Sequence, residues 1–111
     1  MKTYNKLVRD NVVGVLERLH KHPVYETEHD NQRYLHLLFT KDREEAAELE
    51  EAVKTGQRNK IVEELVDKME VWLAIAAIFS ISHDELERAR KKKHADMGGF
   101  KKRTVLMSAD A

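Results

Sequence analysis

Apolar residues recur every three or four positions along most of the chain, with polar residues between them, and this spacing predicts amphipathic α-helices. Four helices are expected, at about Leu7 to His20, Gln32 to Lys54, Arg58 to Phe79 and Ser82 to Asp96. Thr55-Gly56 forms a C-terminal stop for the second helix, and Ser82-His83-Asp84-Glu85 has the form of a capping box that opens the fourth. The segment between the first two helices is expected to be a loop, and residues 104–111 a tail.

The third helix differs from the others because it is apolar on every side from Val71 to Phe79. Such a segment is buried all round, at the centre of a bundle or in a subunit interface, and we interpret its Trp72 as a core residue. A chain of 111 residues leaves room for one domain and little beyond a helical bundle. We therefore predict a single all-α domain, a bundle of about four helices completed by homo-oligomerisation as a homodimer or homotetramer.

Composition excludes several classes of function. Basic and acidic residues balance, with 20 Lys and Arg against 20 Asp and Glu, so no net field favours nucleic acid or an anionic membrane as partner. The absence of cysteine excludes disulfides, thiolate metal sites and cysteine nucleophiles. The N-terminus has no apolar leader and the longest apolar run is too short for a membrane span, so we expect a cytoplasmic protein. No internal repeat or linker is evident.

Two acidic pairs are the strongest chemical signal. Glu45 and Glu48 lie three residues apart in the second predicted helix, and Glu64 and Asp67 lie three apart in the third. Residues at this spacing share a helix surface, and a short connection makes consecutive helices antiparallel neighbours, so the four carboxylates can converge. Four converging carboxylates favour a hard divalent ion, Mg²⁺ or Mn²⁺, with a phosphate chain as substrate. The alternative is that these acids are merely solvated.

Charge is segregated along the chain in a way that suits such a substrate. Six of the ten residues from Asp42 to Glu51 are acidic, whereas the segment from Arg88 to Arg103 carries eight Lys and Arg against one Asp. No glycine-rich phosphate loop and no pair of histidines at zinc spacing is found. Phosphate binding would therefore depend on metal and basic side chains. The candidate phosphate contacts are Lys6, Arg9, Lys41 and Lys93.

A family resemblance extends over nearly the whole chain. The opening YNKLVRD, the segment Glu44-Glu45-Ala46-Ala47-Glu48, the segment Glu64-Leu65-Val66-Asp67 and the late GGF occur in the order seen in MazG-like, all-α nucleoside triphosphate pyrophosphohydrolases. The chain is similar above all to the small house-cleaning members, which are grouped with phosphoribosyl-ATP pyrophosphohydrolase-like proteins. The resemblance implies Mg²⁺-dependent cleavage of the α–β phosphate linkage of a nucleoside triphosphate, which yields a monophosphate and pyrophosphate.

The resemblance also implies roles for the acidic and basic residues. Glu45, Glu48, Glu64 and Asp67 would coordinate Mg²⁺, and Glu44 or Glu45 would orient or deprotonate the attacking water. It points to Lys6 and Arg9, and to a lysine near the end of the fourth helix, as phosphate contacts. Two alternatives remain open at this stage: phosphoribosyl-ATP pyrophosphohydrolase of histidine biosynthesis, and a non-catalytic helical module for oligomerisation or partner binding.

Overall fold

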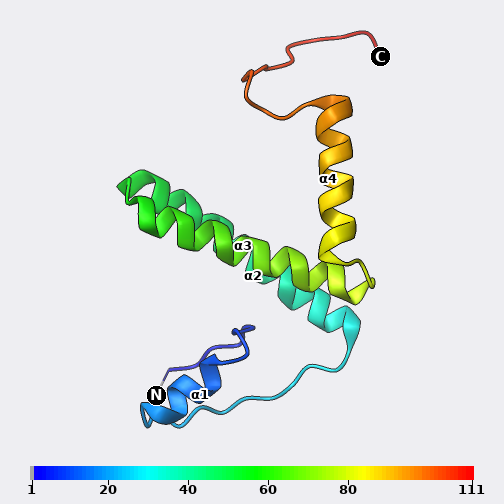
Figure 1. Ribbon diagram of the computed structural model, residues 1–111. Helices are drawn as coiled ribbons and strands as arrows, with labels where there is room; N and C mark the ends of the chain where they lie inside the picture. The colour runs from blue at the N-terminus through cyan, green and yellow to red at the C-terminus, as the bar shows by residue number, and fades with distance from the viewer. Residues whose placement is uncertain (1) are drawn as a thin grey trace. The chain divides into compact units, whose positions relative to one another are not determined.

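The computed structural model describes residues 2–111, and regular structure in this range is helical throughout (Figure 1). The four helices are α1 (Val12–Arg18), α2 (Asn31–Thr55), α3 (Arg58–Ile78) and α4 (His83–Met97). The prediction of an all-α fold with about four helices is thus confirmed. The chain divides into two compact units, Met1–Phe79 and Ser80–Ala111, which we describe separately.

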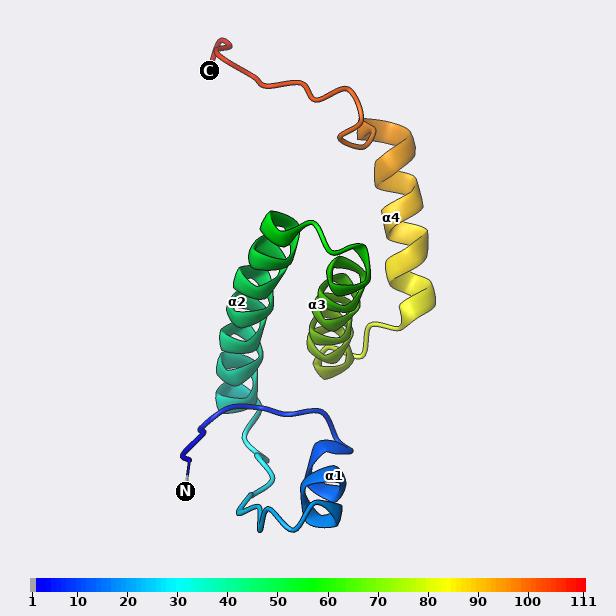
Figure 2. The same ribbon diagram turned by 90° about the vertical axis from the view of Figure 1, so that its left-hand side faces the viewer.

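The first unit is built on a hairpin of α2 and α3, which lie side by side in both ribbon views (Figures 1 and 2). The side chain of Asp30 caps α2 by accepting a hydrogen bond from the backbone N–H of Arg33. Gly56 ends this helix in the left-handed conformation, with φ of 70°, as the Thr55-Gly56 stop predicts. Because Arg58 already begins α3, the connection is short and the two helices pack directly against each other.

Few side chains of the hairpin are fully buried. The buried apolar residues are Leu38 and Ala52 on α2 and Val71 and Ala76 on α3. A polar contact reinforces this small core, because the carboxylate of Asp42 accepts hydrogen bonds from Lys68 Nζ at 2.9 Å and from the indole Nε1 of Trp72 at 3.2 Å. Both donors belong to α3, so Asp42 ties the two helices together.

Two predictions about helices require correction. The first helix begins at Val12 instead of Leu7, with Asn11 as its N-cap, and ends at Arg18. It stops short of His20 because that residue has a left-handed backbone with φ of 54°. The stretch from Val71 to Phe79 is not buried all round within one chain, so it does not form the centre of a bundle; its burial in a subunit interface stays a prediction. Trp72 is 50% exposed and Phe79 60% exposed, although α3 packs against α2.

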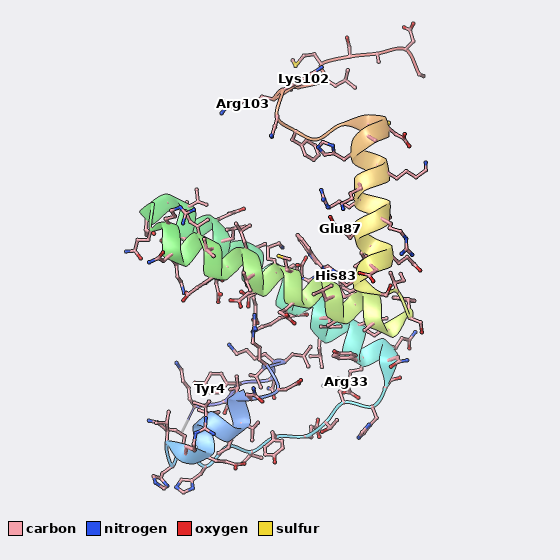
Figure 3. All side chains as sticks on the ribbon, in the orientation of Figure 1. Tyr4, Arg33, His83, Glu87, Lys102 and Arg103 are labelled. Atoms are coloured by element: carbon pink, nitrogen blue, oxygen red, sulfur yellow. The ribbon has the colours of Figure 1, made fainter. Side chains whose placement is uncertain are left out.

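The second unit consists of α4 and the residues after it. Ser82 caps α4 by accepting a hydrogen bond from the backbone N–H of Glu85 at 3.1 Å, which is the capping interaction that the sequence predicts. On its surface Glu87 pairs with Arg90 at 2.6 Å (Figure 3). Residues 104–111 form no helix or strand. Within the described residues, no helix is both long enough and apolar enough to span a bilayer.

Candidate active site

Three carboxylates from the two hairpin helices meet at one point. Glu45 and Glu48 extend from α2 and Glu64 from α3, and each offers an oxygen that lies within 4.8 Å of the other two. Glu64 is 2% exposed and Glu45 5% exposed, whereas Glu48 lies at the solvent edge. The spacing of three residues sets Glu48 one turn after Glu45, and packing of α3 against α2 brings Glu64 to them.

Each buried glutamate has one oxygen bound to a lysine and one oxygen without a partner. Lys41 Nζ lies 3.6 Å from Glu45 Oε1, and Lys60 Nζ lies 3.1 Å from Glu64 Oε1. The Oε2 atoms of Glu45 and Glu64 accept no hydrogen bond from any donor in the described part of the chain. A buried carboxylate oxygen without a partner is costly, so these two atoms mark a place that a cation would stabilise.

The electrostatics of the cluster separate the two buried acids. The pKa of Glu45 is raised to about 7. The causes are its burial, a hydrogen bond with Glu64 and the negative charge of Glu48. Burial also acts to raise the pKa of Glu64, but the hydrogen bond from Lys60 and those shared with Glu45 and Glu48 outweigh it and lower that pKa. Near neutral pH the proton of this pair therefore belongs mainly to Glu45, and Glu64 remains ionised.

Asp67, the fourth predicted ligand, is not part of this group of three. Its carboxylate accepts a hydrogen bond of 2.6 Å from the guanidinium of Arg9, and both side chains are partly exposed. Asp67 is still close enough for its charge to contribute to the raised pKa of Glu45. The structure thus brings together three of the four predicted acids and pairs the fourth with a predicted phosphate contact.

An open cavity of about 840 Å³ lies beside the cluster, between the N-terminal segment with α1 and the α2–α3 hairpin. Its basic lining residues are Lys6, Arg9 and Lys41, three of the four predicted phosphate contacts. Glu45 and Asp67 also line it, and apolar side chains from all three helices form part of its wall. The cavity therefore combines apolar surface with cationic groups next to the acidic cluster, as a nucleotide requires.

The remaining predicted residues are not members of the group of three carboxylates. Glu44 is half-buried and pairs with Lys41 at 3.5 Å, and it is not one of the three clustered acids. Lys6 lies on the N-terminal segment, and its Nζ lies 5.6 Å from the ring centroid of Tyr4. Lys93 is exposed on α4, in the second unit of the chain.

Sequence reasoning missed Lys60. The signal that reveals it is a short repeat, because the pattern Lys-x-x-Glu-Glu-x-x-acid occurs in α2 from Lys41 to Glu48 and again in α3 from Lys60 to Asp67. In both copies the lysine lies within 3.6 Å of each of the two following glutamates. The expectation that the chain contains no internal repeat was therefore wrong at this scale.

The residues present suit a divalent cation. Three carboxylates offer oxygen atoms within a small space, two buried oxygens lack partners, and oxygen ligands are those that Mg²⁺ and Mn²⁺ prefer. The described residues of this cluster include no histidine, so a metal that favours nitrogen ligands has less to bind there. We conclude that Glu45, Glu48 and Glu64 could bind a divalent metal.

Comparison with known proteins identifies the family of the chain. The family model for phosphoribosyl-ATP pyrophosphohydrolase matches residues 13–94, a range that includes all three clustered acids and both copies of the lysine-acid repeat. No curated protein and no solved structure matches the chain significantly. The predicted membership of the MazG-like and phosphoribosyl-ATP pyrophosphohydrolase-like superfamily is confirmed. The chain belongs to the phosphoribosyl-ATP pyrophosphohydrolase family and is a nucleotide pyrophosphohydrolase, a hydrolase that acts on acid anhydrides.

Proposed function

We propose that this protein hydrolyses a nucleoside triphosphate or deoxynucleoside triphosphate between the α and β phosphates, with Mg²⁺ as cofactor, and so clears unwanted nucleotides. The products are a nucleoside monophosphate and pyrophosphate. The observation that carries the proposal is the meeting of Glu45, Glu48 and Glu64 beside a cavity that is lined by Lys6, Arg9 and Lys41. Anionic ligands for the metal and cationic groups for phosphate are thus available in one unit of the chain.

Glu45, Glu48 and Glu64 are the proposed metal ligands, with Asp67 joining them after it separates from Arg9. When bound, Mg²⁺ supplies neutralisation of phosphate charge and stabilises the leaving pyrophosphate. The rest of the chemistry belongs to the side chains. Since Arg9 pairs with Asp67 by a flexible and partly exposed side chain, its guanidinium is free to turn from that carboxylate to a phosphate oxygen.

The hydrolytic step needs a group that accepts a proton from water. The water oxygen forms a bond to one phosphorus atom of the α–β linkage, the bond from that phosphorus to the bridging oxygen breaks, and the released water proton passes to a carboxylate. Glu45 is a candidate for this role because its carboxylate belongs to the cluster and also lines the larger cavity. Glu44, one residue earlier and paired with Lys41, is the second candidate for orienting the water.

Phosphoribosyl-ATP is the second candidate substrate, and the family match favours it. Its triphosphate would be cut at the same linkage by the same residues, but the additional phosphate on its second ribose needs a cationic contact of its own. Lys6 lines the larger cavity and is a predicted phosphate contact that could supply it. Complementation of a histidine auxotroph separates this substrate from ordinary nucleotides.

We also propose that the chain acts as a homodimer or homotetramer. Five neighbouring apolar side chains of α3 are about half exposed in the single chain, and the buried core of the hairpin is small. A second copy that covers this face would bury apolar surface that one chain leaves in contact with water. The five residues are Val62, Leu65, Val66, Met69 and Trp72.

The decisive experiment measures monophosphate and pyrophosphate release from standard and modified nucleotides and from phosphoribosyl-ATP, with and without Mg²⁺. Glu64→Ala serves as the contamination control and should be inactive. In the same samples Mg²⁺ should raise the melting temperature of the wild type, because only the folded state gathers the three ligands, and should leave that of Glu64→Ala unchanged. Absence of product together with absence of a Mg²⁺ effect on melting would favour a non-catalytic helical module instead.

A further inference from the structure

A second, smaller cavity of about 410 Å³ lies on the other side of the acidic cluster, near the turn that joins α2 to α3. Glu48 and Glu64 line this smaller cavity, whereas Glu45 lines the larger one. The three clustered carboxylates therefore lie between two cavities. A triphosphate whose α–β linkage is cut at these carboxylates would extend into both, with the nucleoside and α phosphate on one side and the β and γ phosphates on the other.

The two cavities are lined by different sets of side chains. The larger one includes Tyr34, Leu38 and Val71, which suit a base and a ribose. The smaller one is lined by polar and charged side chains with a single alanine, Ala52, among its described lining residues. A compact and highly charged group would find donors there in Gln57 and Lys60. The division favours the nucleoside in the larger cavity and the leaving pyrophosphate in the smaller one.

Lys60 supplies the cation that such a group needs. It is the basic residue among the described side chains that line the smaller cavity, and its side chain is 51% exposed, so the ammonium has room to move. It now lies 3.1 Å from Glu64 Oε1. Lys41 has the equivalent relation to Glu45 and lines the larger cavity. Each copy of the repeat thus places a lysine, paired with a buried glutamate of the cluster, in the wall of one cavity.

Gln57 provides a second polar group at the same place. It is the N-cap residue of α3, yet its side chain makes no capping hydrogen bond. Its amide is therefore available to donate to a ligand in the smaller cavity, which it lines together with Lys60.

We propose that the smaller cavity is the subsite for the leaving pyrophosphate, with Lys60 as its cationic contact and Gln57 as an additional donor. This inference rests on the proposed function and specifies where the two products lie. Three glutamates also line the cavity, Glu48, Glu51 and Glu64, and they repel an anion. Pyrophosphate therefore binds only when a divalent ion occupies the cluster, and Lys60 then exchanges Glu64 for a phosphate oxygen.

The test is calorimetric binding of pyrophosphate, with and without Mg²⁺, to the wild type and to Lys60→Met. Pyrophosphate is the same product for every nucleotide, so the measurement does not depend on knowing the base. Loss of one charged contact should weaken pyrophosphate binding by at least about tenfold. Affinity for the nucleoside monophosphate product should change by less than about twofold. Lys54→Met, which removes an exposed lysine that lines neither cavity, is the matched control.

A second variant guards against an effect on folding, since Lys60→Met leaves buried Glu64 without its counter-charge. Gln57→Glu adds a negative charge to the smaller cavity and leaves the pair between Lys60 and Glu64 in place. It should also weaken pyrophosphate binding selectively, and Lys41→Met should weaken binding of the monophosphate instead.

The outcomes separate this inference from the proposed function. If the wild type hydrolyses nucleotides and binds pyrophosphate with Mg²⁺, but Lys60→Met and Gln57→Glu bind it as the wild type does, the subsite is refuted and the function stands. The subsite is also refuted, and the function stands, if Lys41→Met is the variant in which pyrophosphate binding is weakened. If the wild type neither hydrolyses any nucleotide nor binds pyrophosphate with Mg²⁺, the proposed function itself is refuted.

Discussion

Replacing Glu45 with glutamine should make the metal-free protein more stable at alkaline pH. In the wild type this carboxyl is buried, adjoins two other acids and has its pKa raised to about 7. The folded state therefore binds the Glu45 proton more tightly than the unfolded chain, whose carboxyl titrates near 4.5. Stability is then lost as the pH rises from about 4.5 to 7, because folding must hold a buried anion that the unfolded state solvates.

The magnitude follows from the shift. A rise from 4.5 to about 7 is about 2.5 pH units, and at 1.36 kcal/mol per unit the metal-free protein loses about 3 kcal/mol between pH 4.5 and pH 8. This is a large share of the 5 to 15 kcal/mol that is typical of a small domain. The lowered pKa of Glu64 has the opposite sign, since its contribution is lost only as the pH falls below 4.5. Measurements between pH 5.5 and pH 8 therefore isolate Glu45.

The assay is urea unfolding in the presence of a chelator at fixed protein concentration, for the wild type, Glu45→Gln and the control Glu50→Gln. The free energy of unfolding of Glu45→Gln should rise relative to that of the wild type as the pH rises. At pH 8 it should be larger by about 3 kcal/mol. Glu50 is exposed on the same helix, so its variant should follow the wild type at every pH. Parallel curves for the wild type and Glu45→Gln would refute the assignment of a raised pKa to this residue.

Three further results are expected from changes outside the acidic cluster. Asp42→Ala removes the acceptor shared by Lys68 and Trp72 and should lower the free energy of unfolding by about 1 to 2 kcal/mol; an unchanged urea midpoint would contradict this role. Gly56→Ala should cost about 1 kcal/mol in the same assay, since a side chain at φ of 70° is strained although no atom lies within 4 Å of the added carbon. If the wild type self-associates as proposed, Met69→Glu should be monomeric in size-exclusion chromatography with light scattering, and a monomeric wild type would refute self-association.

Local signals predicted the fold well where they were strong. Helices α2, α3 and α4 begin and end within a residue or two of their predicted limits. Gly56 ends α2 and Ser82 caps α4, as their residue types predict. The first helix was predicted too long. Leu7 and Val8 have helical spacing relative to the residues after them, but they line the larger cavity, and a contact of that kind leaves no periodic signal.

At the site, the sequence did not predict which side chains meet, because tertiary contacts decide this. Periodicity predicts that Glu64 shares a helix surface with Asp67, but only packing decides that Glu64 meets Glu45 and Glu48 while Asp67 meets Arg9. Trp72 was misassigned for a related reason. Its apolar stripe predicts burial, yet within one chain the ring stays half exposed and its N–H is bound by Asp42. Whether a stripe faces the core or another copy is not encoded in its spacing.

Lys60 shows how a pattern can carry more than its separate residues do. A lysine four residues before a glutamate is common on exposed helices and stabilises them by a few tenths of a kcal/mol, so neither copy attracts attention alone. The two copies matter because each contains a buried glutamate. In each copy the lysine binds Oε1 of that glutamate, while Oε2 of the same carboxylate has no partner. Removing a lysine therefore exposes no new apolar surface but leaves a buried carboxylate unbalanced. A cation on the free oxygens would relieve that cost and release both lysines toward phosphate.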